Sequence, residues 1–105
     1  MDKIINQYLP LTESTAYILL ALSTPLHGYG IMQKVEAISE STVKIGPGTL
    51  YGAFSTLESE GLIVKVGEED RRKIYTLTKK GKEVLKAHIQ RLEILVKNGA
   101  ITKDW

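Results

Sequence analysis

A segment framed by glycines, GPGTLYGAFSTLESEGLI (residues 46–63), places the strongest constraint on the fold. Leu50, Phe54 and Leu57 recur at the spacing i, i+4, i+7, which predicts the buried face of a helix. Gly61 suits the left-handed conformation that follows many helix ends, and the aliphatic Leu62 can pack back on the last turn. The segment therefore predicts a short helix that ends abruptly before an apolar run.

Two further helical patterns precede this segment. Thr12 can cap a helix that contains the apolar run from Ala16 to Leu22, and the sequence Ser-Thr-Pro at 23–25 stops that helix. His27 stands before a second helix, where we expect it to act as a cap or a packing residue. The predicted inner face of this second helix consists of Ile31, Val35 and Ile38. Residues 39–42 are expected to form a turn.

Two strand-like runs and a long helix follow. The runs LIVKVG (residues 62–67) and RRKIYTLT (residues 71–78) flank the charged sequence GEEDR (residues 67–71), which predicts a β-hairpin. Thr78 begins the last helix, and Asn98 with Gly99 ends it. The fold class is therefore mainly α with a small β-hairpin (α+β). Three helices, a hairpin and a further helix describe a winged helix-turn-helix, in which the third helix enters the DNA major groove.

No repeat or linker divides the chain of 105 residues. We expect a winged helix-turn-helix DNA-binding domain over residues 1–78, a C-terminal dimerisation helix over residues 79–99 and a tail over residues 100–105. The hydrophobic content of 43% supports one modest core, and a domain of this size gains only marginal stability from its own burial. Burial against a partner subunit would add to this stability.

Composition excludes several classes of function. The chain has no cysteine, so thiolate metal sites and cysteine nucleophiles are absent, and its two histidines, 61 positions apart, form no recognisable metal site. No nucleophile elbow, phosphate loop or paired acid and base is present, so we expect no enzyme, no catalytic residue and no cofactor. The longest apolar run is too short to span a membrane, and the N-terminus does not resemble a signal peptide. We expect a cytoplasmic protein.

The net charge of +2 is unevenly distributed. Residues 1–61 carry three lysines and six acidic residues, whereas residues 62–105 carry eleven Lys or Arg and six acidic residues. A basic half beside an acidic half indicates a polyanion as partner. A solvated, lysine-rich surface is the alternative.

Four segments resemble one family. LTESTAYILLAL, HGYGI, GTLYGAFSTLESEGLI and RRKIYTLTKKG occur in this order between residues 9 and 97, and together they resemble the PadR-type transcriptional repressors, particularly their short members. The resemblance implies a winged-helix homodimer that pairs through its C-terminal helix and binds an inverted-repeat operator in double-stranded DNA. It also implies that a small-molecule effector, often aromatic or drug-like, releases DNA from some members.

The third helix carries the predicted DNA contacts. Gly48 lets the backbone approach DNA, and Thr49, Gly52 and Ser55 share the face opposite the buried one. Short hydroxyls can bond base edges, the methyl of Thr49 can touch a thymine methyl, and the phenol of Tyr51 can reach a phosphate. Alternatively, Thr49 is a simple cap and Tyr51 an aromatic at the core edge.

Positive charge must come from outside the third helix, because residues 46–64 contain only Glu58 and Glu60 as charged residues. Affinity for DNA follows the number of phosphates neutralised. The candidate cations are Lys44, Lys65, Arg71, Arg72 and Lys73. We expect Arg72 or Lys73 to reach a phosphate or the minor groove. The alternative is a solvated turn that Glu68, Glu69 and Asp70 balance.

An apolar stripe on the last helix predicts the dimer. Its members are Leu85, His88, Ile89, Leu92, Leu95 and Val96. We interpret His88 as a polar group tolerated at the interface. A two-fold pair would place two third helices about 34 Å apart, which matches two half-sites. Alternatively, the helix folds back on its own domain.

The resemblance also implies that drug-binding members line a pocket at the dimer interface with aromatic side chains. Residues 81–99 of the last helix contain no aromatic side chain, so this chain departs from that pattern. Tyr8, Tyr17 and Trp105 are the remaining candidates to meet near the interface.

Two other functions fit parts of the sequence. A winged-helix protein-interaction module without DNA binding would suit the cation-free third helix and the acidic first half. A small-molecule sensor that signals through a partner protein is the third hypothesis. DNA-binding assays beside a ligand screen would separate them.

Overall fold

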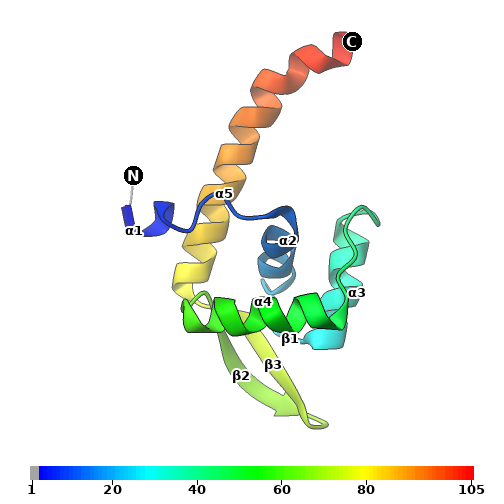
Figure 1. Cartoon of the computed structure of the whole chain (residues 1–105), viewed down its shortest axis with the longest axis vertical. Helices are drawn as coiled ribbons and strands as arrows, with labels where there is room; N and C mark the ends of the chain where they lie inside the picture. Colours follow the sequence, from blue (N-terminus) through cyan, green and yellow to red (C-terminus); the bar gives the residue numbers. More distant parts are fainter. Residues whose placement is uncertain (1–2) are drawn as a thin grey trace.

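The computed structural model describes residues 3–105, so the first two residues of the predicted DNA-binding domain lie outside the described residues. Helices α1 (Lys3–Asn6), α2 (Glu13–Ala21) and α3 (Gly28–Ile38) come first, with strand β1 (Leu26–His27) before α3. Helix α4 (Pro47–Ser59), strands β2 (Ile63–Glu69) and β3 (Arg72–Leu77), helix α5 (Lys79–Asn98) and the 3-10 helix η1 (Gly99–Asp104) follow. This order confirms the winged helix-turn-helix fold. Helix α5 rises from the body in Figure 1, and the hairpin of β2 and β3 projects from the opposite end.

The helices begin at the predicted caps. The Thr12 hydroxyl accepts a hydrogen bond of 3.1 Å from an N–H of the first turn of α2. His27 Nδ1 accepts one of 3.4 Å at the start of α3, which confirms its role as a cap. The Thr78 hydroxyl accepts a hydrogen bond of 2.9 Å from the Gly81 N–H in the first turn of α5. Each bond satisfies an N–H that has no partner inside its helix.

The core lies between α2, α3, α4, the sheet and the first turns of α5. The residues Leu50, Phe54 and Leu57 are all buried, as predicted from their spacing. Ile31 and Val35 are fully buried on α3, but the prediction for Ile38 is wrong: it lies at the exposed end of the helix. Ile38 is the last residue of α3 and does not belong to the core cluster, whereas Ile31 and Val35 do.

The end of α4 has the predicted geometry. Gly61 adopts a φ of +76°, and the Leu62 N–H donates to the Leu57 carbonyl at 2.9 Å. Leu62 itself is buried. A left-handed glycine followed by a buried aliphatic is the usual way to end a helix and turn the chain into the next element.

The hairpin, here called the wing (residues 63–77), differs from the prediction in two details. Strand β2 continues to Glu69, so the turn consists of Asp70 and Arg71 alone, with φ of 50° and 66°, rather than residues 67–71. This two-residue turn matches the twist of the strands. Strand β1 also pairs with β3, which makes a three-stranded antiparallel sheet in the order β1-β3-β2. A strand of two residues is too short to show a periodicity in the sequence.

Helix α5 ends at Asn98 as predicted, but the tail continues as η1. Helix α1 was not predicted either. The molecule extends 51 Å along its longest axis, mainly because the distal half of α5 and η1 leave the body (Figure 1). Among residues 3–105, no helix is long and apolar enough to cross a membrane, and no cluster of His, Cys, Asp or Glu could hold a metal.

Candidate nucleic-acid interface

The outward face of α4 is open and carries no cation. Thr49, Gly52 and Ser55 are all exposed, and a Cβ placed on Gly48 or Gly52 would meet no atom within 4 Å. Gly46 precedes α4 in the capping position and no side chain caps the helix, so the alternative in which Thr49 caps it is wrong. Uncapped N–H groups at a helix start attract anions. This face is therefore open and offers backbone N–H and hydroxyl donors.

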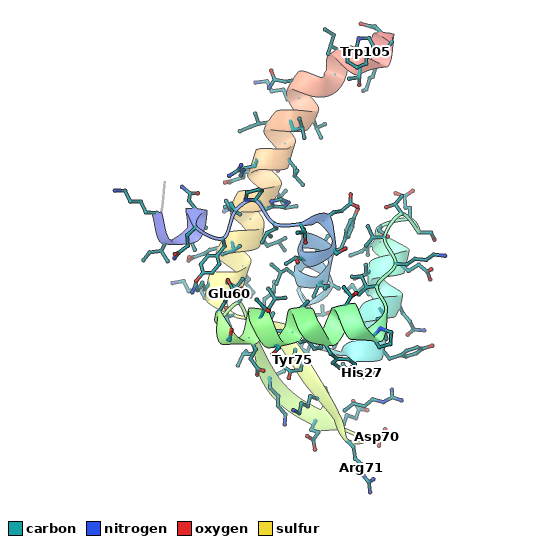
Figure 2. All side chains as sticks on the ribbon, in the orientation of Figure 1. His27, Glu60, Asp70, Arg71, Tyr75 and Trp105 are labelled. Atoms are coloured by element: carbon teal, nitrogen blue, oxygen red, sulfur yellow. The ribbon has the colours of Figure 1, made fainter. Side chains whose placement is uncertain are left out.

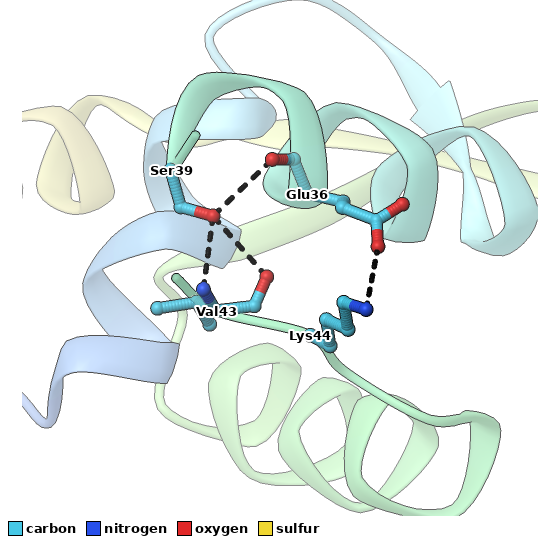
Figure 3. Close-up of polar contacts among 4 residues, drawn as sticks. All are labelled: Glu36, Ser39, Val43 and Lys44. Carbon is cyan, nitrogen blue, oxygen red and sulfur yellow. Dashed lines mark hydrogen bonds and ion pairs between the residues drawn. The ribbon is translucent and has the colours of Figure 1, made fainter. Parts of the chain in front are cut away.

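A buried serine fixes the turn that leads into α4. Ser39 accepts a hydrogen bond of 3.1 Å from the Val43 N–H, and its own hydroxyl proton can reach the Glu36 or the Val43 carbonyl (Figure 3). Glu40 and Ser41 adopt positive φ values of 53° and 65°, which makes the turn tight. The turn expected at residues 39–42 is confirmed, and it holds the start of α4 in place.

Tyr51 is both packed and accessible. Its ring contacts the ring of Phe54 edge to face, with centroids 5.9 Å apart, and Phe54 packs on Tyr75 at 4.8 Å. The side chain is nevertheless 58% exposed. A Cβ on Gly28 would lie 2.9 Å from the Tyr51 hydroxyl, so a larger residue at this position would make the end of the Tyr51 side chain shift. The core-edge role and the predicted phosphate contact are therefore compatible.

A groove of about 650 Å³ separates α4 from the wing. Its floor contains Phe54 and Tyr75, and Arg71, Arg72 and Lys73 line the wing side. The start of α3 lines the third side with residues that were not predicted as site residues: His27, Gly28 and Tyr29. Figure 2 shows His27 and Tyr75 beside α4 with Arg71 at the wing tip. Only the fold brings the start of α3 to this groove, so no spacing in the sequence could reveal it.

Burial raises the pKa of Tyr75, and the nearby Glu58 carboxylate raises it further, while Lys65 opposes the shift. The phenol on the groove floor therefore stays protonated and can donate a hydrogen bond.

The cations at the tip of the wing, Arg71, Arg72 and Lys73, are exposed and form no ion pair within the described part of the chain. Arg71 lies in the turn, and Arg72 and Lys73 lie on β3 opposite Glu69 and Glu68. Within the described part of the chain, ion pairs join only Lys44 to Glu36 at 3.6 Å and Lys65 to Glu68 at 3.2 Å. The alternative in which acidic neighbours balance the wing therefore lacks ion pairs to support it. Lys44 and Lys65 are held only by exposed pairs, which are weak.

The stripe predicted for the dimer divides into two parts. Leu85 and His88 are buried within the subunit, whereas the distal members are exposed: Ile89, Leu92, Leu95 and Val96. Leu95 and Val96 are 67% and 72% exposed. The proximal half of α5 thus packs on its own domain, as in the alternative in which the helix folds back. The distal half does not. Ile94 and Ile101, which were not predicted, and the 90% exposed Trp105 add apolar surface.

His88 belongs to the subunit core. Its Nδ1 accepts a hydrogen bond of 3.3 Å from the Leu11 N–H, and 5% of the residue is exposed. Burial lowers the pKa of His88, and the Arg91 guanidinium lowers it further. The neutral imidazole therefore joins α5 to the segment before α2. Of the aromatic candidates, Tyr8 and Tyr17 pack against this core, while Trp105 lies at the far end of η1 (Figure 2).

The exposed helix α4 beside a basic wing defines the winged helix-turn-helix class of DNA-binding transcription regulators. Residues 11–87 match the transcriptional regulator PadR-like family. The chain therefore belongs to the PadR-like family, as its four sequence segments predicted.

Solved structures agree with this assignment. A transcriptional regulator from Clostridium thermocellum is 29% identical, with a TM-score of 0.68, over 98% of this chain and 95% of that one. A PadR family transcription regulator from Clostridium difficile R20291 is 26% identical, with a TM-score of 0.69, over 81% and 92% of the two chains. RosR from H. salinarum, at 24% identity and a TM-score of 0.66 over 89% and 81%, shares the fold.

One curated relative is much longer. An uncharacterized protein in a transposon of Streptomyces fradiae is 40% identical over 74 residues, which are 70% of this chain. The match spans 21% of that protein.

Proposed function

We propose that this protein is a homodimeric repressor that binds an inverted-repeat operator, with α4 in the major groove and the wing on the adjacent backbone. The uncapped, hydroxyl-bearing start of α4, beside wing-tip cations that form no ion pair in the described part of the chain, carries the proposal. Thr49 and Ser55 would read base edges, and Tyr51 and Tyr29 would bond phosphates. Lys44, Lys65 and the wing cations would supply the attraction to the backbone.

The exposed distal half of α5 supports the dimer. Ile89, Leu92, Leu95 and Val96 leave a continuous apolar stripe without cover in the single subunit. Burying it against a second copy would place two α4 helices on one face, and a two-fold pair of readers requires a two-fold repeat in DNA.

Mobility-shift assays on the DNA upstream of the protein's own gene test this function. The protein should bind one upstream segment at least about a thousandfold more tightly than random duplex. Footprinting of that segment should show two inverted half-sites. The protein should also repress a reporter gene placed behind the segment. Binding to upstream and random DNA with equal affinity would contradict the proposal.

The proposed effector would act through the dimer. A molecule that prefers a dimer angle unsuited to the operator would release DNA by shifting the population. The absence of aromatic side chains between residues 81 and 99 argues against an aromatic cage on α5 itself. A thermal-shift screen, followed by the mobility-shift assay with each hit, tests for such a molecule.

A further inference from the structure

The end of α4 and the start of α5 are joined by a dense set of hydrogen bonds. The Thr78 N–H donates to the Leu62 carbonyl at 3.1 Å, and the Thr78 hydroxyl donates to the Gly61 carbonyl at 2.6 Å. Lys80 Nζ donates to the Glu60 carbonyl at 2.9 Å. Three consecutive carbonyls after α4 thus accept bonds from the residues that begin α5. Figure 2 shows Glu60 at this meeting point.

Gly81 allows this close contact. A Cβ on Gly81 would overlap the carbonyl oxygen of Leu62 and would lie 3.0 Å from the carbonyl carbon. The overlap is with backbone, which cannot swing aside as the end of a side chain can. Gly81 and Leu62 are both buried. Any other residue at this position would force α5 away from the chain that leaves α4.

Lys80 is held from a second direction. Its ammonium lies 4.6 Å from the centre of the Tyr8 ring, a cation–π contact with the segment before α2. The side chain therefore joins the N-terminal segment, the end of α4 and the start of α5.

Small rotations at this junction have large effects at a distance. Helix α5 has 20 residues, which corresponds to about 30 Å. A rotation of about 6–7° about its base moves its far end by about 3.4 Å, the rise of one base pair. A dimer that pairs through the distal half of α5 can thus hold its two α4 helices in register with DNA only if the junction is stiff.

We propose that Thr78, Lys80 and Gly81, packed on residues 60–62, fix the angle between α4 and α5 and so determine which half-site spacing the dimer accepts. They are positioning residues, and none is placed on DNA. The inference rests on the proposed function, because only a dimer carries two α4 helices.

The experiment measures affinity against spacing. Duplexes carrying two copies of the footprinted half-site are built with the centre-to-centre distance varied in steps of one base pair, beside a duplex with a single half-site. The variants are Gly81→Ala, Thr78→Val and Lys80→Met. Thr78→Ser, which keeps the hydroxyl, and Lys79→Met, which removes an exposed neighbouring lysine, are the matched controls. Circular dichroism and thermal unfolding identify any variant that fails to fold.

The wild type and both controls should prefer one spacing by about tenfold over spacings one or two base pairs away. The three variants should reduce this preference by about fivefold, with half-site affinity unchanged within about twofold. Equal weakening of all duplexes, with the spacing preference intact, would overturn the inference and leave the dimeric repressor standing. A wild type that binds single half-sites but shows no spacing preference would overturn both. If Gly81→Ala does not fold, the other two variants decide.

Discussion

The charges of the wing offer the most quantitative test of how this protein holds DNA. Arg72 and Lys73 are exposed, form no ion pair in the described part of the chain, and line the groove beside α4. A DNA backbone that follows this groove would pass both side chains. Replacing both by glutamine (Arg72→Gln with Lys73→Gln) removes both charges and leaves polar, though shorter, side chains.

The expected effect follows from counterion release. Each phosphate neutralised on duplex DNA contributes about −0.9 to the slope of log Kobs against log salt concentration. If one of the two cations in each subunit contacts a phosphate, the slope of the double variant becomes shallower by about 1.8, and if both do, by about 3.6. At a slope difference of 1.8, raising salt from about 50 to about 200 mM costs the wild type about twelvefold more affinity than the variant.

Fluorescence anisotropy with a labelled operator, at several salt concentrations, measures both slopes. The matched control is Lys97→Gln with Lys103→Gln, which removes the same charge at the end of the molecule opposite the wing (Figure 1). The control should keep the wild-type slope, because charges beyond a Debye length of about 10 Å are largely screened. If the wing variant keeps the wild-type slope, or if the control changes it equally, the wing does not contact DNA phosphates.

Three further predictions concern α4, the dimer and pH. Thr49→Ala should weaken operator binding by about 1–3 kcal/mol without changing affinity for random duplex, whereas Thr56→Ala, whose hydroxyl bonds within its own helix, should leave both unchanged in competition assays. Leu95→Asp should yield single subunits in sedimentation equilibrium, whereas Ile94→Asp, on another face of α5, should remain dimeric. Because burial lowers the pKa of His88, the unfolded chain takes up a proton before the folded one, so wild-type stability should fall as pH drops below about 6.5. His88→Gln should show a shallower loss in urea unfolding at pH 5 against pH 8.

Each of these predictions has a contradicting result. Equal losses on operator and random DNA would remove Thr49 from base readout. A dimer that survives Leu95→Asp but dissociates with Ile94→Asp would move the interface to the other face of α5. Parallel pH profiles of wild type and His88→Gln would mean that another group controls acid stability.

Local patterns in the sequence were sufficient to predict most of the fold. The spacing of Leu50, Phe54 and Leu57, the cap at Thr12 and the helix start at Thr78 depend on neighbours within a few residues, and all five behave as predicted. Strand β1 and helices α1 and η1 are too short to show a period. Strand β1 is held by its pairing with β3, and α1 packs against α5, whereas η1 simply continues the chain after α5.

The site was less predictable because its sides come from distant segments. The outward face of α4 and the wing cations were found from the sequence, since each lies on a single element. His27 and Tyr29 reach the same groove only after α3 has packed across α4. His88 shows the converse: its place on an apolar stripe suggested an interface, but the bond to the Leu11 N–H uses it inside the subunit.

The separation of hydroxyls from cations has a functional consequence. A lysine that reached a phosphate from α4 would attract every DNA sequence equally, because phosphate contacts carry no base information. With the cations on the wing and at Lys44, non-specific affinity can change without altering the surface that meets the bases. A regulator needs a high ratio of specific to non-specific binding rather than the tightest binding. If Thr49 and Ser55 read base edges as proposed, their place on a face without cations would raise that ratio, since a hydroxyl gains little from DNA unless its partner on the base edge is in place.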